Sequence, residues 1–144
     1  MRFLGLLKAD EESEAGVPPT PELMAEMGKL MEEVTKAGVL LATDGLHPSS
    51  AGARVRLSGG KLNVTDGPFT ESKELIASYA LFEVKSIQEA IDWTSRFLKV
   101  LGKGECDIYQ VFEASDFPAE LFPPEEAARE EELRKKMQRN AASP

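Results

Sequence analysis

The spacing of apolar residues along the chain switches between two periods, and each period predicts one type of element. Four stretches rich in apolar and β-branched residues predict strands, at residues 3–7, 39–43, 75–84 and 106–112. Apolar residues at helical spacing predict two helices: one begins after Thr20 and ends at Gly38, and the other runs from Ser86 to Gly102. The acidic, proline-containing segment 9–19 is expected to be an exposed loop.

A hairpin interrupts this alternation of strands and helices. Residues 54–64 alternate between polar and apolar side chains on either side of the turn Ser58-Gly59-Gly60, which predicts a β-hairpin with one apolar face. Without the hairpin the order is βαββαβ, which predicts an α+β fold of the ferredoxin-like, dimeric α/β-barrel type. In this fold both helices cover one face of the sheet, so the other face is left uncovered. An uncovered face needs a partner, and a second copy of the chain is the usual one, so we expect a homodimer.

The last part of the chain has a different composition. Prolines between residues 118 and 124 interrupt regular structure, and residues 125–139 predict a helix with favourable charge pairs four residues apart. The apolar edge of this helix is sparse, which is typical of a solvated helix. We therefore divide the chain into a ferredoxin-like domain at residues 1–115 and a linker with a charged C-terminal helix at residues 116–144.

Composition narrows the classes of partner. The 144 residues, 42% of them hydrophobic, have the size and apolar content of one globular domain. The formal net charge of −8 argues against nucleic acid and anionic lipid as partners. No apolar run approaches the ~20 residues of a membrane span, and the apolar start is too short for a signal peptide, so we expect a cytoplasmic protein.

Neither a metal nor another cofactor is expected. Cys106 is the single cysteine, which excludes an intrachain disulfide, and its apolar surroundings predict a small buried side chain. The spacings of cysteine and histidine that typify zinc sites are absent from the sequence.

The most distinctive run in the chain is Asp66-Gly67-Pro68-Phe69-Thr70-Glu71-Ser72-Lys73-Glu74. Asp-Gly alone is a common turn signal. Here Pro68 follows it, which stiffens the turn and removes one amide donor. Phe69 is a large apolar side chain in an otherwise polar loop, so this run is more specific than a plain turn.

This run resembles the signature of the DGPF proteins, which are also called YCII-related proteins. The resemblance extends over residues 1–115 and includes the segments 37–40, 45–50, 53–56, 75–77 and 83–86. It implies a ferredoxin-like α+β fold, a dimer and a cleft near the dimer interface. Many members of the family are uncharacterised, many are encoded beside extracytoplasmic-function sigma factors, and one relative is a dehydrochlorinase.

Two positions depart from the family pattern. Relatives that are proposed to use a histidine–aspartate pair usually place the histidine on the first helix, where this chain has none. Its only histidine, His47, lies in the segment 45–50, so the pair is not carried over directly. Many members have arginine in the last strand where this chain has Tyr109, so no anion-binding role is assigned to that strand.

His47 and Asp66 are the candidate catalytic residues. Histidine suits proton transfer near neutral pH, and a carboxylate from Asp44 or Asp66 would orient its ring. The alternative is that His47 is a solvated loop residue and that Asp66 only forms its turn. The sequence leaves both alternatives open.

The candidate residues for substrate binding are Arg54, Arg56, Phe69 and Lys73. Arg54 and Arg56 alternate onto the polar face of the hairpin, where they are either solvated charges or a clamp for an anionic group at a dimer cleft. Lys73 either contacts the substrate or pairs with a neighbouring glutamate.

Three functions follow from these residues. The first is a metal-free acid–base enzyme that acts on a small organic molecule, with His47 and an aspartate in a cleft at the dimer interface. The second is a non-catalytic, ligand-binding or regulatory dimer associated with a sigma-factor pathway. The third is an interaction module that uses its charged tail as the contact. A closed cleft around His47 favours the first function, an apolar and uncharged cleft favours the second, and a docked tail helix favours the third.

Overall fold

The chain forms two compact units, Met1–Val111 and Phe112–Pro144, and each is described by itself. This organisation comes from a computed structural model, which describes residues 1–70 and 74–142.

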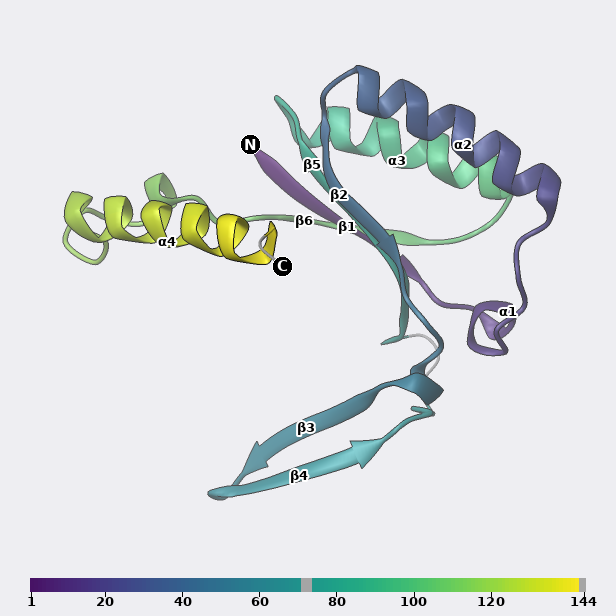
Figure 1. The fold of residues 1–144 in the computed structure, drawn as a ribbon, viewed down its shortest axis with the longest axis horizontal. Helices are drawn as coiled ribbons and strands as arrows, with labels where there is room; N and C mark the ends of the chain where they lie inside the picture. The colour runs from purple at the N-terminus through teal and green to yellow at the C-terminus, as the bar shows by residue number, and fades with distance from the viewer. Residues whose placement is uncertain (71–73, 143–144) are drawn as a thin grey trace. The chain divides into compact units, whose positions relative to one another are not determined.

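A four-stranded sheet forms the centre of the first unit (Figure 1). Its order is β2-β5-β1-β6 and all neighbouring strands are antiparallel. The strands are β1 (Arg2–Lys8), β2 (Leu40–Gly45), β5 (Ile76–Glu83) and β6 (Cys106–Gln110). Helix α2 (Pro21–Lys36) connects β1 to β2, and α3 (Ile87–Leu101) connects β5 to β6. The order of elements is therefore βαββαβ, and the predicted ferredoxin-like α+β fold is confirmed.

Local sequence sets the ends of both helices. The Thr20 side chain accepts a hydrogen bond from the Leu23 amide at 3.1 Å, and Pro21 takes the first helical position of α2. The Ser86 side chain caps α3 by accepting from the Glu89 amide at 3.2 Å. Gly102 ends α3 with a left-handed backbone, φ 78°, which glycine adopts without a steric penalty.

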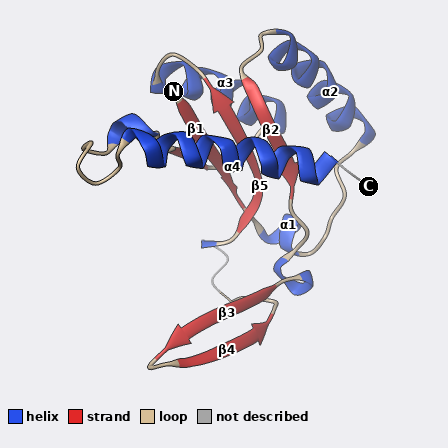
Figure 2. Ribbon diagram, turned by 60° about the vertical axis from the view of Figure 1, so that its left-hand side comes forward, coloured by secondary structure: helices blue, strands red, loops and turns tan. Residues whose placement is uncertain are grey.

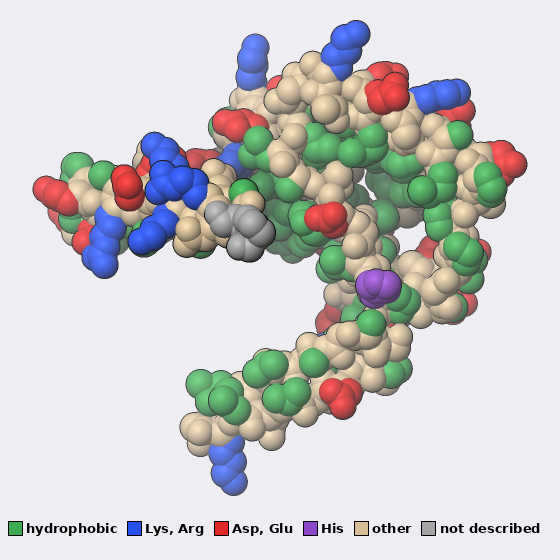
Figure 3. Space-filling view, viewed as in Figure 1, with side chains coloured by type: hydrophobic (Ala, Val, Ile, Leu, Met, Phe, Trp, Pro, Cys, Tyr) green, Lys and Arg blue, Asp and Glu red, His purple; other side chains and the backbone are tan. Residues whose placement is uncertain are grey.

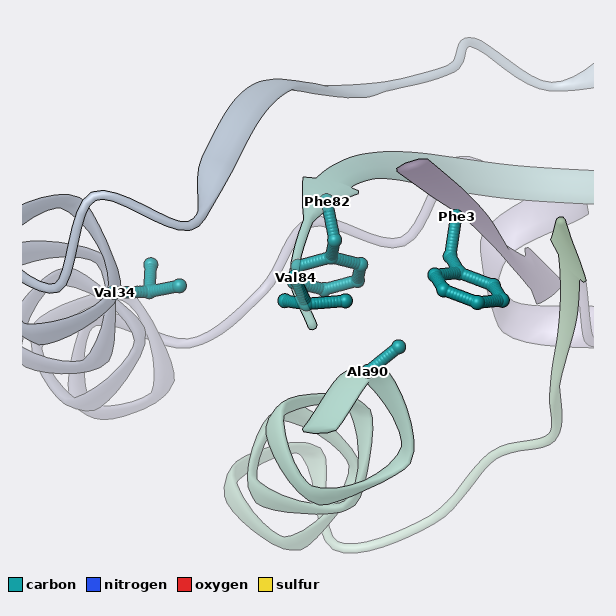
Figure 4. Close-up of a cluster of buried hydrophobic side chains, with 5 residues drawn as sticks. All are labelled: Phe3, Val34, Phe82, Val84 and Ala90. Carbon is teal, nitrogen blue, oxygen red and sulfur yellow. The ribbon is translucent and has the colours of Figure 1, made fainter. Parts of the chain in front are cut away.

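The core lies between the sheet and the two helices (Figure 4). Phe3 and Phe82 are opposite each other in the β1–β5 register and are each 1% exposed. Val34 from α2 and Ala90 from α3 join the same cluster, and both are fully buried. Both helices therefore cover one face of the sheet, and neither lies on the other face.

The predicted hairpin consists of β3 (Ala53–Ser58) and β4 (Lys61–Asp66), which form a separate two-stranded sheet. It projects away from the four-stranded sheet (Figures 1 and 2). Val55 lies opposite Val64 and Leu57 lies opposite Leu62, so the four aliphatic side chains share one face of the hairpin.

Residues 9–19 contain a helix, which corrects our expectation that they form a loop throughout. Helix α1 (Glu11–Glu14) is capped by Asp10, whose side chain accepts from the Ser13 amide at 2.8 Å. Lys103, in the turn after α3, forms ion pairs with Asp10 at 3.2 Å and Glu12 at 2.8 Å. These charge-assisted contacts lower the pKa of Asp10, with the Ser13 amide as the largest cause. The cap is a local contact, but the cation that supports it, Lys103, lies 91 residues after Glu12 in the sequence.

The second unit has little buried surface. It begins with a short 3₁₀ turn, Ala114–Asp116, and ends with helix α4 (Pro124–Ala142). The Phe117 ring lies 5.1 Å from the Phe112 ring and 5.9 Å from the Phe122 ring, centroid to centroid. No side chain in the described part of α4 is buried.

Deletion of residues 124–144, which removes α4, should leave the fold of the first unit intact. Because α4 buries no described side chain, we expect the free energy of unfolding to change by no more than about 1 kcal/mol. Chemical denaturation of the full and shortened chains, followed by circular dichroism, measures the difference. A loss of soluble expression would show instead that the helix packs on the core.

Candidate functional site

Ser49 joins three segments that are far apart in the sequence. Its hydroxyl donates a hydrogen bond to Glu14 Oε2 at 2.6 Å, and its backbone amide donates to Glu14 Oε1 at 2.9 Å. The same hydroxyl accepts a hydrogen bond from the Phe69 amide at 3.0 Å. The segment 45–52 and the loop that begins with Asp66 are therefore held together, and both are anchored to α1.

Gly67 is the point of closest approach between these two loops. Its amide donates to the Gly52 carbonyl at 3.0 Å, and the Gly67–Pro68 peptide bond is cis. A Cβ atom at Gly67 would lie 1.7 Å from the Ser49 carbonyl oxygen, so only glycine fits without moving the backbone.

Three of the four predicted substrate-binding residues, Arg54, Arg56 and Phe69, lie on the hairpin and at its base. The Arg54 guanidinium lies 4.3 Å from the centre of the Phe69 ring, which is a cation–π contact. Arg54 and Arg56 border a shallow polar groove on the hairpin together with Asn63 and Thr65. Lys73 is outside the described residues.

The predicted catalytic residues lie in the two joined loops, and neither lines the hairpin groove or the apolar pocket described below. His47 is exposed (the purple side chain in Figure 3), and Asp66 is the exposed last residue of β4. Among the described residues, no hydrogen bond or ion pair joins His47 to Asp66 or to Asp44. Asp44 instead accepts a hydrogen bond from the Tyr79 hydroxyl at 2.7 Å, and this bond raises the pKa of Tyr79.

A pocket of about 210 Å³ lies elsewhere in the first unit, between the sheet and the helices. Its walls are mostly apolar: Leu7 and Phe82 contribute from the sheet, Met31 from α2, and Phe97 and Leu101 from α3. Met27 and Met31 of α2 also line the pocket, and methionine side chains adapt readily to ligands of different shape.

The sequence of the sheet face explains where this pocket forms. At one end of the β1–β5 pair, Phe3 opposite Phe82 fills the space beneath the helices. Along the same face, the next pair is Gly5 opposite Ala80. Because these two side chains are so small, the helices span a gap that the sheet does not fill.

Besides Asp44 and Tyr79, the pocket lining contains four polar side chains from different elements: Thr43 on β2, Ser78 on β5, Thr94 on α3 and Cys106 on β6. Thr94 on α3 is 8% exposed, and its hydroxyl is buried without a hydrogen-bond partner among the described residues. Cys106 on β6 is half-buried rather than fully buried as we expected. Burial raises the pKa of the Cys106 thiol, and the charge of Asp107 adds to this effect.

Asp44 and Tyr79 border the pocket but direct their side chains elsewhere. Thr43 pairs with Ala80 on the face of the sheet that meets the helices. Side chains alternate along a strand, so Asp44 and its partner Tyr79 point to the opposite face. The pocket is therefore mostly apolar, with a few weakly polar groups in its lining, and the carboxylate–tyrosine pair belongs to the sheet face opposite to α2 and α3.

Sequence reasoning missed three residues that shape these sites. Glu14 was part of the expected loop, and Ser49 lies in the segment 45–50, in which only His47 was a candidate. Thr94 lies in the expected helix between Ser86 and Gly102, and nothing in its spacing distinguishes an unpartnered hydroxyl from a satisfied one. In the described ranges, no group of three or more His, Cys, Asp and Glu side chains is placed to hold a metal ion. No helix there is long and apolar enough to cross a membrane.

Gly67→Ala should destabilise the protein by about 1–3 kcal/mol, because the new methyl group forces the two loops apart. The matched control is Gly28→Ala on α2, where a Cβ atom meets nothing within 4 Å. This control should gain up to about 1 kcal/mol from helix propensity. Thermal and chemical unfolding of both variants measure these changes in stability. A neutral Gly67→Ala would contradict the close contact between the two loops.

Comparison with known proteins places this chain in a family. An uncharacterised protein of Rhizobium meliloti (strain 1021) is 34% identical over 71 residues, which are 49% of this chain and 57% of that protein. The aligned part thus spans just over half the length of that relative. The 5-chloro-2-hydroxyhydroquinone dehydrochlorinase of Burkholderia phenoliruptrix AC1100, solved with 2,5-dihydroxybenzoquinone, is 13% identical with a TM-score of 0.44. That likeness covers 82% of this chain and all of the dehydrochlorinase. The family model of the YCII-related domain matches residues 1–115, so the chain belongs to the YCII-related family.

Proposed function

We propose that the protein binds a small, largely apolar organic molecule in the pocket between the sheet and the helices. The observation that carries this proposal is the Thr94 hydroxyl, which is buried in an apolar pocket without a partner. A few polar groups in an otherwise apolar cavity are typical of small-molecule sites. The pocket is smaller than the roughly 300–1,000 Å³ of sites for drug-sized ligands, so its ligand is small.

The energy of the unpartnered hydroxyl supports a ligand with one polar group. A threonine inside a helix commonly donates to the carbonyl four residues earlier, which for Thr94 is Ala90. That bond is not formed. A buried polar group left unpaired costs about 1–3 kcal/mol, which a ligand atom that hydrogen-bonds to the hydroxyl would recover. The adjacent Cys106 thiol is a second, weaker contact for the same molecule.

Cys106 offers a direct test, because it is the chain's single cysteine and lines the pocket. Its raised pKa keeps the thiol protonated to higher pH, so alkylation should begin at a more alkaline pH than for a free cysteine. Small aromatic and aliphatic compounds that occupy the pocket should then slow the alkylation of Cys106, as followed by intact-mass spectrometry. Compounds that bind without protecting Cys106 would place the ligand elsewhere.

Thr94→Val separates the role of the hydroxyl from the shape of the pocket. Without ligand, this variant should be more stable by about 1 kcal/mol, because it removes a buried unpaired polar group at nearly constant volume. It should also bind compounds with a hydrogen-bonding group about tenfold more weakly, which is the effect of one lost neutral hydrogen bond. The control is Thr35→Val on the exposed side of α2, which should change neither quantity. A destabilised Thr94→Val with unchanged affinity would contradict the proposal.

An acid–base enzyme is the second candidate function. The Tyr79–Asp44 pair favours it, because it places a carboxylate with a fixed orientation on the sheet face that carries no helix. His47 follows Asp44 by three residues, so a substrate on this face would meet both groups near one end of β2. In this function Asp44, with one oxygen held by Tyr79, or His47 accepts the proton.

Substrate turnover distinguishes the two functions. A panel of small organic compounds, including compounds that do not protect Cys106, should be incubated with the protein and analysed by mass spectrometry, because the Asp44 side chain points to the sheet face opposite to the pocket. If the protein is an enzyme, wild type should convert such a compound, and Asp44→Asn and His47→Ala should lose most of this conversion with unchanged thermal midpoints. Binding without conversion would leave the ligand-binding function and remove the enzymatic one.

A further inference from the structure

The β3–β4 hairpin, residues 53–66, is called the arm below, and its two faces differ in charge. Side chains alternate between the faces, and one face carries the four aliphatic side chains together with Asp66, the only carboxylate of the arm. On the other face, each of three successive cross-strand pairs joins a cation to a neutral side chain that can form hydrogen bonds: Arg54 with Thr65, Arg56 with Asn63, and Lys61 with Ser58. This face is therefore basic, although the whole chain has 25 acidic and 17 basic residues.

Arg54 and Arg56 have no carboxylate partner among the described residues. Three other arginines, Arg96, Arg129 and Arg134, each form an ion pair with a glutamate. By contrast, no ion pair or hydrogen bond joins Arg54 or Arg56 to another described residue. The two arginines are two positions apart in β3, which places their Cα atoms about 7 Å apart. Like charges this close repel each other, and an anion between them is attracted by both.

The ring of Phe69 orients one of these two cations. The Arg54 guanidinium lies 4.3 Å from the ring centre, and the Phe69 amide is itself bonded to the Ser49 hydroxyl at 3.0 Å. A guanidinium that stacks on an aromatic ring uses its flat face, so the N–H donors at its edge remain available to a ligand. The Arg54 side chain is therefore oriented before any ligand binds.

The two arginines and their cross-strand neighbours Asn63 and Thr65 line a groove of about 340 Å³. All four side chains can donate hydrogen bonds to a ligand. A phosphate monoester has three acceptor oxygens and a charge of roughly −1.5 to −2 at pH 7, whereas a carboxylate has fewer oxygens and a single charge. Two adjacent guanidinium groups with further donors beside them therefore match a phosphate group better than a carboxylate.

We propose that this groove binds the phosphate group of a small phosphorylated molecule. Arg54 and Arg56 hold the phosphate oxygens from two successive rows of the arm, and Asn63 and Thr65 donate hydrogen bonds from the neighbouring strand. Our sequence-based hypothesis placed the two arginines at a dimer cleft, whereas this groove is formed by one chain. The inference goes beyond the proposed function, because no residue of the groove lines the apolar pocket.

Titration of the full chain with phenyl phosphate, followed by amide chemical shifts in nuclear magnetic resonance spectra, tests the proposal. Wild type should bind with a dissociation constant on the order of 1 mM at low ionic strength, and the shift changes should be concentrated in the arm. Benzoate, which has the same ring and a carboxylate in place of the phosphate, should bind at least about fivefold more weakly. Equal affinity for the two compounds, or shift changes that lie outside the arm, would overturn the proposal.

Matched variants identify the side chains that hold the phosphate. Arg56→Gln removes one charge-assisted contact and should raise the dissociation constant about tenfold. The control is Lys99→Gln, which removes the same charge from an exposed position of α3 and should stay within about twofold of wild type. The proposal fails if Arg56→Gln binds phenyl phosphate as tightly as this control.

Phe69→Leu tests the orientation of Arg54. Loss of the cation–π contact should weaken the binding of phenyl phosphate about threefold in wild type. The same substitution in an Arg54→Gln background should have no further effect, because Phe69 acts through Arg54. An equal loss in both backgrounds would show a general effect on the loop and contradict this positioning role.

A short single-stranded oligothymidylate extends the test to nucleic acid. With few cations on the arm and a net charge of −8, the chain should bind it no more tightly than phenyl phosphate. Binding of the oligonucleotide that is at least about tenfold tighter and is lost in Arg56→Gln would make the groove a nucleic-acid surface, and would overturn the assignment to a small molecule.

Discussion

Phe3 on β1 and Phe82 on β5 lie opposite each other in the antiparallel register, and both side chains are almost completely buried beneath the two helices. The other features of the first unit depend on this register. Because side chains alternate along a strand, a slip of β1 by one residue would turn Leu4 towards the helices and Phe3 away from them. The pairing therefore determines which face meets α2 and α3 and which face stays bare.

The same register divides the possible chemistry between the two faces of the sheet. On the face that meets the helices, the large Phe3–Phe82 pair is followed by the small Gly5–Ala80 pair, and beside this small pair lies a mostly apolar pocket with the Thr94 hydroxyl and the Cys106 thiol in its lining. On the opposite face, the Tyr79 hydroxyl donates a hydrogen bond to the Asp44 carboxylate. The two candidate sites, the apolar pocket and the Tyr79–Asp44 pair, thus use side chains on opposite faces of the sheet.

The family signature has a structural task in addition to any chemical one. Gly67 permits the close approach of two loops, and the Phe69 amide completes the contacts of Ser49, which Glu14 holds from the other side. Phe69 in turn supports the Arg54 guanidinium at the base of the arm. These contacts connect the end of β2, the start of the arm and its return to β5, so they fix where the arm leaves the body.

The sequence by itself determined the elements and their order, because capping residues and hydrophobic spacing act over a few neighbouring positions. Thr20, Ser86 and Gly102 set helix ends where expected, and the alternation in residues 54–64 gave both the hairpin and its apolar face. The ferredoxin-like fold followed from that order.

Only the tertiary structure decided that Glu14 binds Ser49, that Lys103 supports α1, and that the Thr94 hydroxyl faces a pocket unpaired. It also separated His47 from the pocket, which no pattern in the sequence indicated. These contacts join residues tens of positions apart, and their partners depend on strand register and helix packing, which local spacing does not encode.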